Sequence, residues 1–243
     1  MKNRWIKHDS VTSTNTSILE LMKEQSLQEG TIITTDYQEG GRGLGAHSWQ
    51  SNRGENLLMS LLLFPAFLSA KWQFHISRVA ALALCDVVEL LGIDPVIKWP
   101  NDILTGKGKI AGILIENGIT AGNLSHSVIG IGLNLNQTTF PSFQVPATSV
   151  CLETGKRVKV SETGSLVGDH LMRRYQSLKE GHISLLEQAY LERLYQAGVP
   201  SMFVSGDDLF EGTIRGVNEF GELMVESGAG IRSYGHGAIK LEL

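Results

Sequence analysis

Residues 109–116 read KIAGILIE, a run in which only the two end side chains, Lys109 and Glu116, are charged. Residues 127–135, SVIGIGLNL, and residues 96–99, VIKW, have a similar, largely apolar character. Apolar runs bounded by turn residues predict strands, and the lack of polar alternation predicts strands covered on both faces. The centre of the chain is therefore expected to be a buried sheet.

Further strands and helices are expected around this sheet. The β-branched run at 31–36 and the apolar run at 57–64 predict two more strands. A first helix is expected from near Ser17, because Ser17 and Glu20 have the spacing of a capping box, and it should end before Gly30. Apolar residues at helical spacing predict other helices. Their ranges are 69–92, 161–179 and 182–196. This part of the chain is therefore expected to contain both strands and helices.

The chain changes character at Gly198. Beyond it, short β-like pieces are separated by Gly, Asn and Asp, as expected of a small β-barrel. This part holds three Lys or Arg against seven Asp or Glu, which makes it a poor nucleic-acid surface. We therefore predict two domains, residues 1–197 and residues 198–243.

Composition limits the classes of protein to consider. At 243 residues and 42% hydrophobic content the chain can bury a substantial core, and its formal net charge of −4 argues against coating nucleic acid. Cys85 and Cys151 have no metal or disulfide spacing and read as reduced thiols. No signal peptide is visible, and the longest apolar run, 57–64, is too short to span a bilayer. A cytoplasmic protein without a membrane partner is expected.

Residues 38–49, QEGGRGLGAHSW, place four glycines around Arg42. The segment matches a dinucleotide fingerprint formally, but the chain after it runs into another strand instead of a helix, so the Rossmann interpretation fails. A flexible linker is the simpler alternative. Glycines also let backbone N–H groups approach anions, and Arg42 adds a planar cation suited to carboxylate or phosphate. No Walker A spacing is present.

Three other segments carry polar groups beside apolar ones. KWPNDI (98–103) offers Asn101 and Asp102, although an ordinary turn explains them if the segment is taken alone. Lys109 stands at the start of an apolar strand, and residues 12–15, TSTN, cluster before the first helix, where a cap accounts for only one or two of them. Neither a zinc-protease histidine pattern nor a serine-hydrolase elbow is present in the sequence.

The order of these segments is informative. STN, then QxxGRG and Trp49, then KWPND, KIAGILIE and GIGLN follow one another from Ser13 to Asn134. This series resembles the biotin protein ligases, which attach biotin to a lysine of biotin carboxyl carrier proteins. The resemblance implies an α+β fold. Its catalytic domain would be class II synthetase-like, with a mixed sheet flanked by helices, and a small SH3-like barrel would follow at the C-terminal end.

The resemblance also implies a two-step reaction. The biotin carboxylate attacks ATP to form biotinyl-5′-AMP and pyrophosphate, and the carrier lysine then attacks the acyl carbon and releases AMP. Bringing two anions together needs cations and backbone donors, which fits the residue types above. ATP and biotin are the expected substrates, with Mg²⁺ accompanying the phosphates.

Similarity to the family assigns roles to individual residues. Lys109 and Arg42 are the implied catalytic cations, and Asp102 is a weak candidate for a metal-bound phosphate. The implied biotin-binding residues are Ser13, Thr14, Asn15, Gln38, Arg42, Gly43, Leu44, Lys109 and Gly112. The implied adenylate-side residues are Trp49, which would pack near the adenine, Asn101, Gly132 and Asn134, and Gly112 and Gly132 would leave room for the ligand.

Two departures from the family pattern are visible. Leu44, Gly45 and His47 stand where relatives often carry basic loop residues, so the loop is less cationic. The TSTN segment begins at Thr12, so we expect ligase activity without an N-terminal DNA-binding domain and without a nucleic-acid partner. The sequence leaves a homodimer open.

Two alternatives differ in function. A lipoate or octanoate ligase or transferase of related fold would also modify a carrier lysine, although GRGLGAHSW and KWPND favour biotin. A non-catalytic biotin sensor is the other alternative, and the acidic balance of the chain argues against a DNA-bound form of it.

Overall fold

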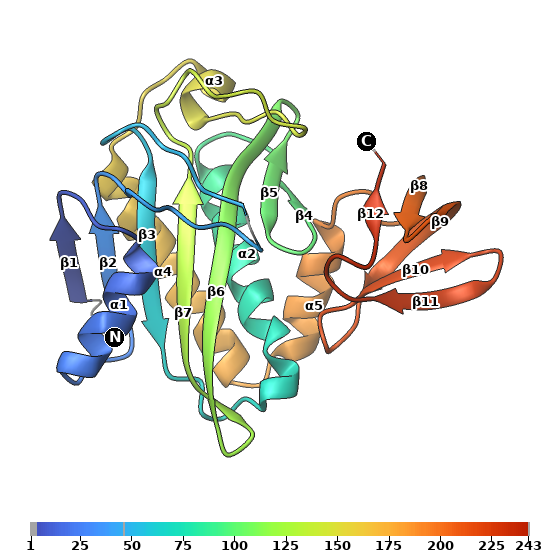
Figure 1. Ribbon diagram of the computed structural model, residues 1–243, viewed down its shortest axis with the longest axis horizontal. Coiled ribbons are helices and arrows are strands. Elements are labelled where there is room, and N and C mark those ends of the chain that lie inside the picture. Colours follow the sequence, from blue (N-terminus) through green and yellow to red (C-terminus); the bar gives the residue numbers. More distant parts are fainter. Residues whose placement is uncertain (1–3, 46, 243) are drawn as a thin grey trace.

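A seven-stranded mixed sheet forms the centre of the larger part of the molecule (Figure 1). The computed structural model describes residues 4–45 and 47–242. The strand order is β1–β2–β3–β7–β6–β5–β4, with β1 and β2 parallel and the other neighbours antiparallel. The strands, in chain order, are β1 (Arg4–His8), β2 (Thr31–Thr35), β3 (Leu57–Leu63), β4 (Val96–Lys98), β5 (Asp102–Thr105), β6 (Gly108–Thr120) and β7 (Asn123–Leu133).

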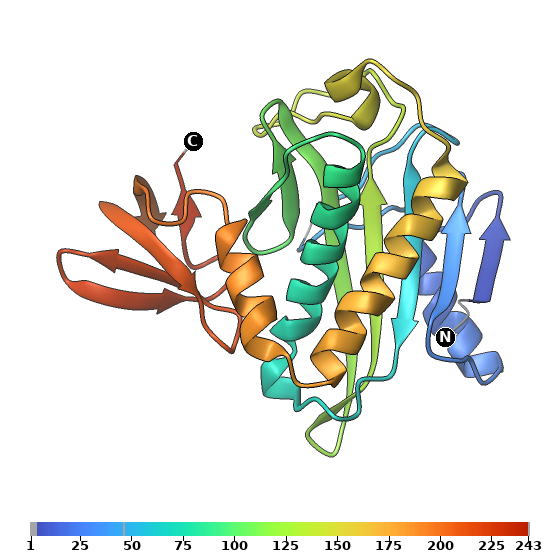
Figure 2. The ribbon, with the colours of Figure 1, turned by 180° about the vertical axis from the view of Figure 1, so that it is seen from behind.

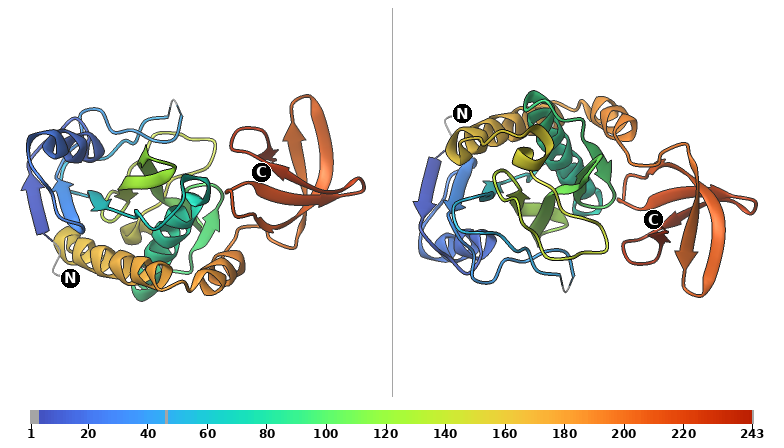
Figure 3. Two further views of the ribbon diagram at one scale, coloured as in Figure 1. Left: turned by 90° about the horizontal axis from the view of Figure 1, so that it is seen from below. Right: turned by 90° about the horizontal axis from the view of Figure 1, so that it is seen from above.

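Helices cover the two faces of this sheet unequally. Figure 2 shows α2, α4 and α5 on one face, and Figure 3 shows α1 on the opposite face. The three are α2 (Phe74–Leu90), α4 (Val160–Lys179) and α5 (Ile183–Glu192), and α1 spans Thr14–Glu24. Two short helical segments, η1 (Ala70–Trp72) and α3 (Val150–Thr154), complete this part. The predicted α+β class with flanking helices is confirmed.

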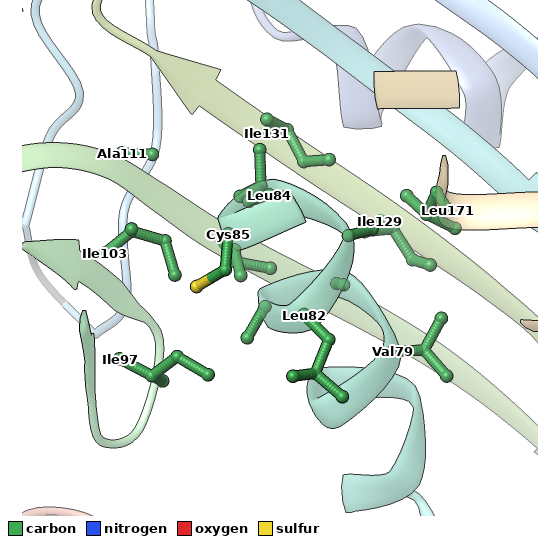
Figure 4. Close-up of a cluster of buried hydrophobic side chains, with 14 of the residues drawn as sticks. Val79, Leu82, Leu84, Cys85, Ile97, Ile103, Ala111, Ile129, Ile131 and Leu171 are labelled. Carbon is green, nitrogen blue, oxygen red and sulfur yellow. The ribbon is translucent and has the colours of Figure 1, made fainter. Parts of the chain in front are cut away.

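The main core lies between α2 and the sheet (Figure 4). Cys85 on α2 is fully buried there, and burial raises the pKa of its thiol to about 12, as expected of a reduced core residue. Ile129 and Ile131 of β7 pack in the same cluster. Because strand side chains alternate between faces, Gly130 and Gly132 lie on the other face of β7. That face carries α1.

The C-terminal part is a five-stranded antiparallel sheet beyond the β4 edge of the larger sheet (Figure 1). Its order, β11–β10–β9–β8–β12, is open, with β11 and β12 at its two edges. Its strands are β8 (Pro200–Ser205), β9 (Asp208–Val217), β10 (Leu223–Ser227), β11 (Gly230–Tyr234) and β12 (Lys240–Leu241). A small β domain was predicted here. The domain boundary at 197/198 stays a prediction, and it falls in the connecting segment between the end of α5 and the start of β8.

Several predicted boundaries were wrong. Helix α1 begins at Thr14, not near Ser17, and the Ser17 hydroxyl donates to the Ser13 carbonyl one turn earlier instead of capping the helix. The helix expected over 69–92 begins at Phe74 after a 3₁₀ turn, and Gly92 follows it with a left-handed φ of 82°. Strands β1 and β5 were not predicted. Both strands are short, and their strand conformation depends on pairing with the neighbouring strands of the sheet.

Candidate active site

A cavity of about 550 Å³ opens where the first turn of α1, the glycine loop 38–49, β6, β7 and the C-terminal sheet meet. Thirteen of the fourteen predicted site residues line it. They are Ser13, Thr14, Asn15, Gln38, Arg42, Gly43, Leu44, Trp49, Asn101, Asp102, Lys109, Gly112 and Gly132. The two predicted cations therefore share one cavity although 67 positions separate them in the sequence.

Asn134 is the exception. Its side-chain amide donates to the Thr148 carbonyl at 2.9 Å, and among the described residues it is not part of the cavity lining. Asn134 thus ties the end of β7 to the segment before α3. Asn101 does line the cavity, but its amide also has a backbone partner, the Ile113 carbonyl at 2.9 Å.

One end of the cavity is built from buried neutral polar groups at the start of α1. Thr14 donates from its backbone N–H and from its hydroxyl to Gln38 Oε1, at 2.8 and 3.1 Å. The Ser60 hydroxyl of β3 lies 2.7 Å from Thr14 Oγ1 and 2.5 Å from Asn15 Oδ1. Since buried polar groups are costly unless they are hydrogen-bonded, this network fixes the orientation of each side chain.

Asn15 connects this end of the cavity to the glycine loop through Glu116. The Asn15 amide donates to Glu116 Oε2 at 2.8 Å and to the Leu114 carbonyl at 3.2 Å. Arg42 donates to the same Glu116 oxygen at 2.7 Å. The loop cation is therefore held at the cavity by a carboxylate of β6.

The glycine loop is a small hairpin. Trp49 N–H donates to the Gly41 carbonyl at 2.9 Å, and Gly43 N–H donates to the His47 carbonyl at 2.7 Å. A side chain at position 41 would collide with the Trp49 carbonyl, so this crossing requires glycine. The described residues of the segment are thus tied together by hydrogen bonds at the cavity, which a flexible linker would not be.

Trp49 lies over the glycine face of β6 and β7. A Cβ atom on Gly112 would stand 2.9 Å from Trp49 Cζ3, and one on Gly132 would enter the indole ring. The ring therefore occupies the space that these glycines leave, which was expected to hold ligand. Lys109 Nζ lies 5.6 Å from the Trp49 ring centroid and 2.6 Å from Asp102 Oδ1. The second cation is therefore also paired with a carboxylate.

Several lining or contacting residues were missed by sequence reasoning. Ser60 and Glu116 belong to apolar runs, and only the alternation of each strand could have placed them on the α1 face. Some of the others come from KWPND or from the C-terminal part of the chain. They include Lys98, Trp99, His236 and Lys240.

Two observations concern metal binding and membrane spanning in the part of the chain that the structure describes. Residues 4–45 and 47–242 contain no group of three His, Cys, Asp or Glu side chains able to hold a metal ion. Within the same residues, no helix has the length and the apolar character needed to cross a membrane.

A model of the biotin/lipoate A/B protein ligase family matches residues 8–134, just over half of the chain. The chain belongs to this family. It is 31% identical over 239 residues to the bifunctional ligase/repressor BirA of Bacillus subtilis (strain 168), and this match covers 96% of this chain and 72% of that relative. It is 30% identical over 225 residues to the biotin–[acetyl-CoA-carboxylase] ligase of Paracoccus denitrificans, and this match covers 90% of this chain and 92% of that relative.

Solved biotin protein ligases have the same architecture. The Aquifex aeolicus biotin protein ligase, in complex with biotin and ATP, superimposes with a TM-score of 0.80 at 26% identity, covering 100% of this chain and 99% of that one. The resemblance inferred from the order of the five motifs is confirmed, and so is the mixed α+β fold of the catalytic part, whereas the C-terminal part is an open five-stranded sheet and its closure into a barrel stays a prediction.

Proposed function

We propose that this protein is an ATP-dependent ligase that activates biotin as biotinyl-5′-AMP and transfers it to a lysine of a biotin carboxyl carrier protein. One observation carries the proposal. Two cations, Arg42 and Lys109, reach one cavity that also ends in a buried set of hydroxyl and amide groups. A neutral polar end suits the ureido head of biotin, and the cations suit its carboxylate and a phosphate.

The first step joins two anions. A biotin carboxylate oxygen bonds to the α-phosphorus of ATP, the bond from that phosphorus to the bridging oxygen breaks, and pyrophosphate leaves with the electron pair. Lys109, at the start of β6, offsets the charge that develops on the phosphate oxygens, and Arg42 holds the carboxylate from the glycine loop. Their present partners, Asp102 and Glu116, must yield these contacts to the substrates.

The second step consumes the adenylate. The amine of the carrier lysine bonds to the acyl carbon, the bond from that carbon to the phosphate oxygen breaks, and AMP leaves while the nitrogen gives up a proton. The glycine loop and Trp49 cover the cavity on one side and limit access of water to the mixed anhydride. The contact of Trp49 with the adenine is part of the proposal.

Mg²⁺ is expected to arrive with ATP. Asp102 is a carboxylate in the cavity near Lys109, so it would hold the ion as a single protein ligand, with phosphate oxygens and water completing the shell. The ion offsets phosphate charge. Asp102 is thus freed for this role when Lys109 exchanges it for a phosphate oxygen.

We propose a carrier-domain lysine as the acceptor and the cytoplasm, where ATP is available, as the location of the protein. The sequence leaves a homodimer open, and the absence of a nucleic-acid partner stays a prediction. Sedimentation of the pure protein tests the first, and a gel shift with DNA at physiological salt tests the second.

Pyrophosphate release tests the chemistry directly. Purified protein with ATP and Mg²⁺ is supplied in parallel with biotin, lipoate or octanoate, and then with a purified carrier domain. We expect release with biotin alone among the acids, and a mass increase of one biotinyl group on the carrier. A preference for lipoate or octanoate would contradict the biotin assignment, and biotin binding without pyrophosphate release would favour a sensor.

A further inference from the structure

The turn that joins β9 to β10 is held by two side chains of the larger domain. Arg78 of α2 donates from Nη2 to the Val217 carbonyl at 2.8 Å and to the Asn218 carbonyl at 2.9 Å. Trp99, from the KWPND segment, donates from Nε1 to the Gly221 carbonyl at 3.0 Å. Both ends of the 217–221 turn are therefore hydrogen-bonded to the ligase domain.

Arg78 is an unusual residue for its place on the helix. Its side chain is 1% exposed, in a helix whose other buried residues are almost all apolar. Its remaining partners are Glu187 Oε1 at 3.3 Å, His75 Nδ1 at 2.9 Å and the Phe74 ring at 5.1 Å. A buried guanidinium is costly unless it is well partnered, and two of its partners are carbonyls of the C-terminal sheet. Packing of α2 alone would be served by an apolar side chain.

The turn also fits closely between these two donors. Gly221 has a left-handed φ of 89°, and a Cβ atom there would stand 2.6 Å from Phe74 Cδ2. Beyond the turn, the His236 ring centroid lies 6.2 Å from that of Trp99. The contact is thus specific in shape as well as in hydrogen bonding.

The C-terminal sheet in turn forms one wall of the cavity. Phe203, Ile214, Leu223, His236 and Lys240 all line it. The polar set at the start of α1 is at the other end, because α1 packs on β2, β3 and β7 whereas the C-terminal sheet lies beyond β4 (Figure 1). A shift of the 217–221 turn would move His236 and Lys240 relative to Lys109 while leaving the α1 end in place.

We propose that Arg78 and Trp99 are positioning residues that clamp the 217–221 turn and so hold the C-terminal sheet as the wall of the reaction cavity. The kinetic consequence rests on the proposed function. His236 and Lys240 are the polar side chains of that wall, and the ammonium of Lys240 favours the nucleotide phosphates over the neutral biotin head. Release of the clamp therefore raises the KM for ATP and leaves the affinity for biotin unchanged.

The test compares Arg78→Met and Trp99→Phe with a matched control, Arg174→Met. Arg174 also joins two elements, α4 and α2, through Asp86, but its contacts lie away from the cavity. For Arg78→Met we expect KM for ATP to rise about tenfold or more, since two hydrogen bonds from a charged donor are lost, with biotin affinity by calorimetry unchanged. Hydrogen exchange of residues 217–226 should quicken in both clamp variants and stay at the wild-type rate in the control.

Three outcomes would overturn the clamp. These are an unchanged KM for ATP in Arg78→Met, equal losses for ATP and biotin, and unchanged exchange in a folded Trp99→Phe protein. Should Arg78→Met fail to fold, Trp99→Phe carries both measurements. The exchange measurement needs no substrate, so a wild-type protein that does not ligate biotin would refute the proposed function while the clamp is still tested.

Discussion

Replacing Gly130 with alanine should damage biotin binding through Asn15 alone. The φ of Gly130 is not left-handed, so alanine is compatible with its backbone. Its Cβ atom would stand 2.5 Å from Asn15 Oδ1 and 3.1 Å from Asn15 Nδ2. Ordinary contact requires the Asn15 amide to move by about 1 Å, because real Cβ contacts rarely fall below roughly 3.4 Å.

The cost depends on the hydrogen bonds that this movement breaks. The Asn15 amide makes three of them, to Ser60, Leu114 and Glu116. At about 0.5–1.5 kcal/mol each, their loss amounts to roughly 1.5–4.5 kcal/mol. If this falls on the bound state, biotin affinity drops roughly 10- to 2,000-fold.

Calorimetric titration with biotin is the assay, and Gly106→Ala is the control, because a Cβ atom at Gly106 meets nothing within 4 Å. A second comparison uses the double variant that combines Gly130→Ala with Asn15→Ala. Truncating Asn15 removes the atoms with which the new methyl group at position 130 collides, so the double variant should bind biotin no more weakly than Asn15→Ala alone. Additive losses in the double variant would refute this reasoning.

Three further predictions concern the cations, the indole and pH. Lys109→Ala should slow pyrophosphate release about 10²- to 10³-fold with little change in Tm, and wild-type turnover would remove Lys109 from the mechanism. Gly132→Ala should displace the Trp49 indole and shift the tryptophan emission of the ligand-free protein. Burial, then the Arg78 charge, lowers the pKa of His75 from 6.5 to about 4. The unfolded chain thus binds more protons between these values, so the free energy of unfolding should fall by about 2–3 kcal/mol from pH 6.5 to 4. Urea titrations of wild type and His75→Gln, which should lack this slope, check it.

Long periodic segments could be predicted from the sequence because their pattern is local. The apolar spacing of α2 and α4 and the runs of β3, β6 and β7 located these elements to within five residues at each end. The start of α1 could not be predicted the same way. Ser17 and Glu20 have capping-box spacing, but Thr14 is held at the helix start by Gln38, which is 24 positions away. A tertiary contact therefore overrode a local signal.

The site shows the same division. The order of motifs identified the residues that line the cavity, yet it did not reveal that Glu116 joins Asn15 to Arg42 or that Trp49 fills the space over Gly112 and Gly132. Such contacts depend on strand register and on which face a side chain takes. The wall from the C-terminal sheet was missed for a related reason, since domain placement leaves no local periodic signal.

The two ion pairs explain how a cavity built for anions remains stable without them. Lys109 is paired with Asp102 and Arg42 with Glu116, so neither cation lies unpaired in a partly buried site. Partly exposed pairs of this kind contribute little to stability, and exchanging one carboxylate for another is correspondingly cheap. Biotin can therefore replace a resident carboxylate on one cation at small cost, whereas a polyphosphate brings more negative charge than two already paired cations can offset. We propose that Mg²⁺ arriving with ATP offsets part of this charge, together with Lys98 and Lys240 of the cavity lining.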